Sequence, residues 1–148
     1  MPDETIPMWM AVHEAGHAVV ADSLGIPPYA VTTDSESSAV HLKFPSQPTE
    51  LESFISAAIS HAGGLAQMRY GVAPSEGSHA DLRSASEHIA RYLGDQAPPV
   101  IHRLATLQAS NLARALLEQR WDVVVELAKM IVDNGGVLDH SQLGEVLM

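Results

Sequence analysis

The chain has 148 residues, 46 % of them apolar, which is enough to bury one hydrophobic core, so we expect a single domain over residues 1–148. It carries 8 basic and 18 acidic residues, a formal net charge of −10, and the scattered basic residues argue against a nucleic-acid partner or an anionic membrane surface. Because cysteine is absent, disulfides and thiolate ligands are excluded, and any metal must be held by nitrogen and oxygen atoms.

A buried helix is predicted from Met8 to Leu24, because this run is apolar on nearly every side and is followed by Gly25 and Pro27-Pro28. Thr5 is expected to cap this helix. The acidic N-terminus lacks the pattern of a signal peptide, and no window approaches 18 uninterrupted apolar residues. We therefore expect a cytoplasmic protein without a membrane segment.

The sequence His13-Glu14-Ala15-Gly16-His17 lies within this predicted helix. At the i, i+4 spacing both imidazoles stand on one face and can reach one metal ion, while Glu14 projects towards its open side. Shuffling this composition produces the pattern in about 3 % of sequences, so the motif alone is only suggestive. A metal would satisfy the buried histidines and the glutamate together. The alternative is that they are core residues hydrogen-bonded to other groups.

A small hairpin is predicted from two short runs, 29–34 and 39–44, that alternate in polarity around residues 35–38. Its strand Ala39–Phe44 could align an extended peptide by main-chain pairing, or it could simply close the core. His41 in this strand is expected to be an exposed residue.

A capping box at Thr49 and Glu52 predicts the start of a long helix that runs to Tyr70. Gly63-Gly64 interrupts it, and paired glycines in a helix indicate that another backbone packs very close. For His61, beside them, a structural role is favoured over a place in the site.

The next helix is predicted to begin behind a Ser78 cap, and its helical pattern runs from Leu82 to Leu93. Asp81 would lie at its third position, where an acid favours the helix dipole; it is also the right residue type for a third zinc ligand. His79 is the alternative third ligand, but it is two residues from Asp81 and therefore points in another direction from the helix. We favour Asp81.

Three further helices are predicted, at 100–118, at 121–132 and, after the turn Asn134-Gly135-Gly136, at the C-terminus. The first is expected to supply apolar faces through Leu104, Leu107, Leu112, Leu116 and Leu117. His88, His102, Trp121 and His140 are interpreted as structural or surface residues.

In this order, the segments resemble the peptidase domain of the FtsH-type ATP-dependent zinc proteases over nearly the whole chain. The similar pieces are His13–His17, Gly63-Gly64, Tyr70-Gly71, the run Gly77–Leu82, and the later segments Asn111–Asp122, Leu127-Ala128 and Gly136–Asp139. The family usually has Arg and a Glu pair where this chain has Leu65, Ala66, Gln67 and Met68.

The resemblance implies a mainly α, zincin-like fold with a small hairpin, with His13, His17 and Asp81 as zinc ligands and Glu14 as general base. It implies hydrolysis of flexible or unfolded polypeptides. The sequence contains no phosphate-binding loop, so we expect a stand-alone domain, with a homo-oligomer or a separate ATPase as further partners to consider. The alternatives are a zinc-binding adaptor or regulatory module of the same fold, and a structural domain in which the three ligands never meet.

Overall fold

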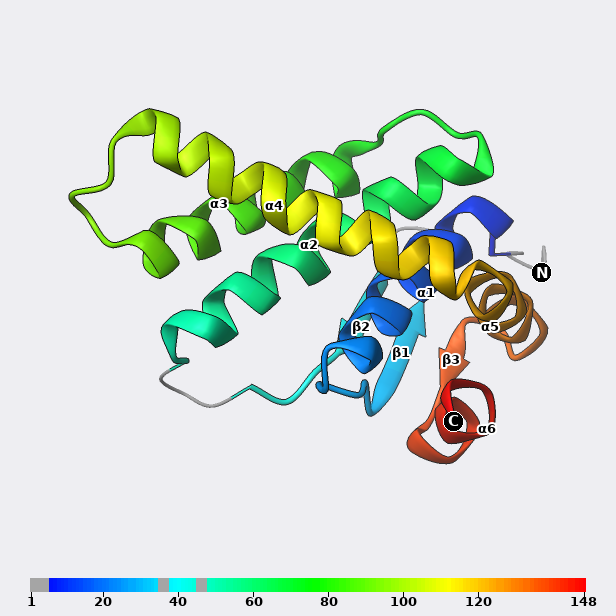
Figure 1. Cartoon of the computed structure of the whole chain (residues 1–148). Helices are drawn as coiled ribbons and strands as arrows, with labels where there is room; N and C mark the ends of the chain where they lie inside the picture. The colour runs from blue at the N-terminus through cyan, green and yellow to red at the C-terminus, as the bar shows by residue number, and fades with distance from the viewer. Residues whose placement is uncertain (1–5, 35–37, 45–47) are drawn as a thin grey trace.

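The structure, a computed structural model, describes residues 6–34, 38–44 and 48–148 (Figure 1). Within these ranges the fold is mainly helical, with one small antiparallel sheet, which confirms the predicted fold class. The helices are α1 (Met8–Ser23), α2 (Glu50–Tyr70), α3 (Glu76–Leu93), α4 (Pro99–Gln119), α5 (Trp121–Asp133) and α6 (His140–Leu147); the strands are β1 (Ala30–Thr33), β2 (Ser38–His41) and β3 (Val137–Leu138). None of the helices in the described ranges is long and apolar enough to cross a membrane.

Helix α1 is the centre of the larger part of the core. Every residue from Ala11 to Ala21 is buried, because the helix packs against α2 on one side and α5 on another. The approach to α2 is very close at Gly16, where an added Cβ would lie only 2.6 Å from the Cβ of Ala66. Pro7 precedes the first turn, and the expected cap Thr5 lies outside the described residues.

Helix α2 begins and ends as predicted. The Thr49 hydroxyl accepts from the backbone N–H of Glu52, whose carboxylate accepts from the N–H of Thr49, and the helix ends at Gly71. Helices α3 and α4 pack on α2 and share with it a second, smaller core that is rich in alanine. Figure 1 shows this end of the molecule at the left and the sheet with α5 and α6 at the right.

The predicted hairpin is present as β1 and β2, and the pairing places Val31 opposite Val40. A third strand, which the sequence did not predict, gives the order β2-β1-β3. Strand β3 follows Gly136, whose carbonyl accepts a hydrogen bond of 2.7 Å from the N–H of Thr33. Strand β2 therefore forms one edge of the sheet, and this edge is beside α1.

One expectation about the helices is wrong, and another holds only for Leu112, Leu116 and Leu117, which pack against the core. Helix α3 begins at Glu76, where the Ser75 hydroxyl caps it, instead of behind Ser78. The N-terminal half of α4 turns alanines, not leucines, towards the core: Ala105 and Ala109 are buried, whereas Leu104 and Leu107 are exposed. Small residues on the inner face allow α4 to lie close to α2.

Candidate metal centre

The first turns of α1 bring two imidazoles together. His13 and His17 are one helical turn apart on the buried face of α1, and their Nε2 atoms are 3.1 Å from each other. The rings meet edge to face, with centroids 4.8 Å apart. Two Nε2 lone pairs this close repel each other unless a proton or a cation lies between them.

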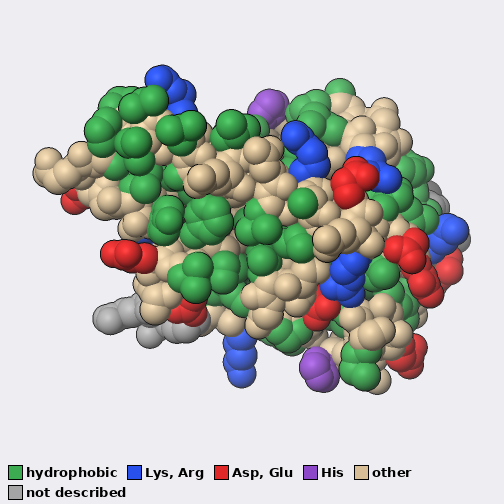
Figure 2. Space-filling model, in the orientation of Figure 1, with side chains coloured by type: hydrophobic (Ala, Val, Ile, Leu, Met, Phe, Trp, Pro, Cys, Tyr) green, Lys and Arg blue, Asp and Glu red, His purple; other side chains and the backbone are tan. Residues whose placement is uncertain are grey.

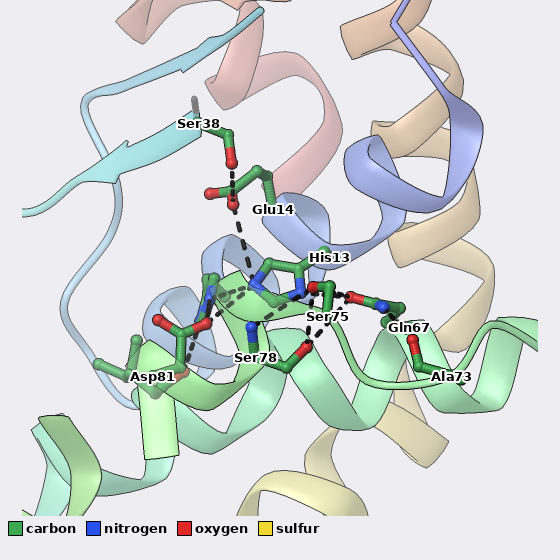
Figure 3. A network of polar contacts seen from close by, with 10 residues as sticks. His13, Glu14, Ser38, Gln67, Ala73, Ser75, Ser78 and Asp81 are labelled. Carbon is green, nitrogen blue, oxygen red and sulfur yellow. Dashed lines mark hydrogen bonds and ion pairs between the residues drawn. The ribbon is translucent and has the colours of Figure 1, made fainter. Parts of the chain in front are cut away.

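Asp81 meets both histidines from α3. Its Oδ2 lies 2.9 Å from His13 Nε2 and 3.0 Å from His17 Nε2 (Figure 3). Because α3 begins at Glu76, Asp81 is in its second turn and beyond the free amides of the first, so the expected role at the helix dipole does not hold. His79, the rival ligand, is exposed.

These three atoms form a triangle that fits a small N/O-coordinated cation. In a tetrahedral zinc site with bonds of about 2.0–2.1 Å, neighbouring ligand atoms are about 3.3 Å apart. The edges here are 2.9, 3.0 and 3.1 Å, so a slight expansion would accommodate the ion. Glu14 belongs to the same group, since its carboxylate and the two imidazoles offer ligand atoms within 4.8 Å of one another.

Hydrogen bonds on the far side of each ring hold the imidazoles in place. His13 Nδ1 donates to Gln67 Oε1 at 2.9 Å, and His17 Nδ1 donates to the carbonyl of Ile59 at 2.7 Å. With the proton on Nδ1, the Nε2 lone pair of each ring is directed into the triangle. The far-side bonds therefore select the tautomer that a metal requires.

Gln67 is itself held by a buried polar network. Its amide nitrogen donates to the carbonyl of Ala73 at 2.6 Å, and the Ser78 hydroxyl donates to its Oε1 at 3.2 Å (Figure 3). In the sequence, Gln67 stands out only as one of the differences from the protease family. The available signal was its position, one helical turn after Gly63 and hence on the same face of α2.

Gly63 forms the floor of the site. An added Cβ would lie 2.6 Å from His13 Nε2 and closer still to His17 Nε2. Gly64 meets only the side chain of Ser78, at an ordinary 3.5 Å. The paired glycines thus mark a close approach, as predicted, but at Gly63 the neighbours are the two imidazoles instead of another backbone.

Glu14 lies at the open side of the triangle. It is buried, its Oε1 accepts a hydrogen bond of 2.7 Å from the Ser38 hydroxyl, and the same oxygen is 3.9 Å from His13 Nε2. Ser38, expected in the turn, is instead the first residue of β2. Together with Ala39 and Val40 it lines one wall of a pocket of about 380 Å³ that contains the site.

The charges of the site are strongly coupled. Burial alone would lower the pKa of His17, but its hydrogen bond with Asp81 and the charges of Glu14 and Asp81 raise that pKa to about 9. Burial opposes ionisation of Asp81, yet its contacts with His13 and with the protonated His17 hold its pKa well below the usual range. At neutral pH the metal-free triangle therefore contains a proton between His17 and an ionised Asp81.

The remaining histidines stay outside the triangle. His61 is buried on α2, its Nε2 has no hydrogen-bond partner among the described residues, and it lines a different cavity, between α2, α3 and α4. Burial lowers its pKa, so it is neutral. His41, expected to be exposed, is half-buried and hydrogen-bonds Thr32 across the hairpin.

Neither protein-family models nor curated proteins gave a match to the chain.

Proposed function

We propose that this protein is a zinc-dependent metallopeptidase. The observation that carries the proposal is the triangle of His13 Nε2, His17 Nε2 and Asp81 Oδ2, with edges of 2.9 to 3.1 Å and the buried carboxylate of Glu14 beside it. The resemblance to the peptidase domain of FtsH-type zinc proteases supports the same assignment of ligands.

The donor set favours zinc over the hard cations. Two imidazole nitrogens and one carboxylate oxygen are typical of zinc, whereas Ca²⁺ and Mg²⁺ require more oxygen ligands. When bound by three protein ligands, zinc lowers the pKa of a water molecule and polarises a carbonyl group. His13 and His17 would hold the ion with Nε2, and Asp81 would neutralise part of its charge.

Glu14 acts as general base and then as general acid. The hydrogen bond from Ser38 fixes the carboxylate, and Oε1, the oxygen 3.9 Å from His13 Nε2, keeps a second lone pair that can take a proton from the attacking water. The same carboxylate then delivers the proton to the leaving amine. Its place on the buried side of α1, one residue after His13, keeps it within reach of the triangle.

Strand β2 is proposed to align the substrate. It is an edge strand of the sheet and lines the pocket with Ser38, Ala39 and Val40, so an extended peptide could add to it by main-chain pairing. Such pairing requires an extended segment, which favours flexible or unfolded polypeptides as substrates. A separate ATPase is the partner that would supply such chains from folded proteins.

The test is cleavage of an unstructured protein, such as reduced casein, by zinc-loaded wild type and by Glu14→Gln. We expect the variant to lose at least about 100-fold in kcat while it retains zinc, because the base is removed and the ligands remain. Glu126→Gln, which changes an exposed glutamate of α5, is the matched control and should cleave like wild type. Equal, background-level cleavage by all three proteins with full zinc occupancy would favour the zinc-binding adaptor instead.

A further inference from the structure

The N-terminal half of helix α4 carries its large apolar side chains on the side that faces away from the core. Val100, Leu104 and Leu107 are 50, 53 and 56 % exposed, whereas the opposite side buries Ala105 and Ala109. At 100° per residue the three exposed positions fall on one stripe, since they are four and three residues apart. A surface helix of an isolated domain normally buries its large apolar side chains and exposes small or polar ones.

The apolar stripe continues onto neighbouring helices. Leu82 of α3 and Met68 of α2 are about half exposed, and with Leu107 they line a cavity of about 540 Å³ between the three helices. Figure 2 shows hydrophobic side chains gathered over the N-terminal half of α4 and below it. We call this surface the α4 patch; it consists of Val100, Ile101, Leu104, Leu107, Leu82 and Met68.

The acidic charge of the molecule is located elsewhere. Residues 82–117 contain four arginines and two carboxylates, a net charge of +2, so the remaining chain has −12. The cavity beside the α4 patch is lined by Arg103 and by no carboxylate. Two copies that meet over this cavity would therefore bring together no carboxylate of its lining.

We propose that the α4 patch binds the α4 patch of a second copy, which forms a two-fold dimer. The exposed positions are nearly symmetric about Leu104, so two antiparallel α4 helices would place Leu104 on the partner's Leu104 and Val100 on the partner's Leu107. A self-complementary arrangement of this kind is what an isologous interface requires.

The size of the α4 patch is also sufficient. Six side chains that are about half exposed present on the order of 500 Å² of apolar surface, which is close to the apolar share of the roughly 800 Å² that each partner buries in a standard interface. The dimer does not depend on the proposed metal chemistry, and the metal centre faces β2 and not this patch.

Sedimentation equilibrium from 1 to 100 μM tests the proposal. Wild type should dimerise in this range, and Leu104→Glu should weaken association at least 100-fold, because it buries two carboxylates at the two-fold axis. Leu51→Glu, which changes a leucine that is 66 % exposed on the first turn of α2, is the matched control and should dimerise like wild type. Circular dichroism verifies that each variant is folded.

A wild type that stays monomeric at 100 μM, or a dimer that Leu104→Glu does not weaken, would overturn the proposal. The salt dependence of the dimer dissociation constant gives an independent check. Apolar association between two negatively charged copies should become tighter with added salt, whereas binding of an acidic partner to Arg103 should become weaker.

A covalent test uses the absence of cysteine from the chain. With oxidised glutathione, Leu104→Cys should form a disulfide-linked dimer at micromolar concentration, because the two thiols lie beside the axis. Leu51→Cys is the control and should remain largely monomeric. Equal cross-linking of the two variants would contradict the proposed geometry.

Discussion

One residue that shapes the candidate metal centre has no side chain. Gly63 lies directly beneath both imidazoles, and helix α2 can present its backbone to them only because no Cβ intervenes. The backbone at this point supports the rings from below while Gln67 and the Ile59 carbonyl hold their far sides. Each imidazole is therefore held in place by its own helix α1, by the backbone at Gly63 and by the hydrogen bond at its Nδ1.

Gly63→Ala should strongly weaken zinc binding, because the new methyl group would occupy the space of His17 Nε2 and force the rings apart. Gly64→Ala is a nearly ideal control: its Cβ makes only ordinary contact with Ser78, and alanine should stabilise the helix by up to about 1 kcal/mol. Zinc affinity by competition with a chromophoric chelator and urea unfolding measure the two effects. Similar zinc affinities for both variants would show that Gly63 does not support the rings.

The sequence predicted site residues where helical spacing or the resemblance to the protease family pointed to them. His13, Glu14 and His17 follow from helical spacing, and the resemblance added Asp81, which the structure brings to both histidines. Gln67, Ser38 and the Ile59 carbonyl were missed. Their roles arise where α2 and β2 meet α1, and no local pattern determines which polar atoms face each other across such contacts.

At the scale of elements, strand β3 ties the C-terminal segment to the sheet through a tight turn. Gly136 has φ 93°, and its carbonyl accepts from Thr33. A side chain there would collide with the carbonyl oxygen of Thr33, so the approach of β3 to β1 requires glycine.

Gly136→Ala should destabilise the protein by more than about 2 kcal/mol, because conformational strain and a collision add together. Gly135→Ala separates the two effects: Gly135 also has positive φ, 69°, but an added Cβ would meet nothing within 4 Å, so only about 1–2 kcal/mol of strain is expected. Urea denaturation at constant pH measures both variants. Equal losses would mean that the close approach of β3 contributes no stability.

The helices were predictable to the extent that their ends carry strong signals. The capping box at Thr49 and Glu52 and the final Gly71 defined α2. The start of α3 was placed too late because Ser75 and Ser78 can both act as N-caps, and the glycine between them weakens helical propensity. Strand β3 has only two residues and depends on pairing with β1, so its own sequence could not reveal it.

For the whole molecule, the metal-free site should make stability depend on pH. His17 has a folded pKa of about 9 and an ordinary value of 6.5, so its contribution is fully present below pH 6.5 and is lost as the pH rises through 9. The expected loss between pH 6 and pH 9.5 is about 3 kcal/mol, or roughly 10 °C in Tm. Bound zinc should abolish this loss, because a ligating His17 has no proton to release.

Differential scanning calorimetry at several pH values, with a chelator or with excess zinc, gives the comparison. Asp81→Asn is the control, because it removes the group whose hydrogen bond raises the pKa of His17 and should flatten the metal-free profile. If the Tm of metal-free Asp81→Asn still falls as the pH rises, the pH dependence of stability belongs to other groups.

The three proposed ligands come from α1 and α3, two helices that make few other contacts with each other. An ion in the triangle would therefore act as a cross-link between the central helix and a peripheral one. Because Asp81 is the most exposed of the three side chains, the ion would be released when α3 separates from α1. The residence time of the metal should then follow the opening rate of α3, so that metal exchange and amide exchange along this helix share one rate.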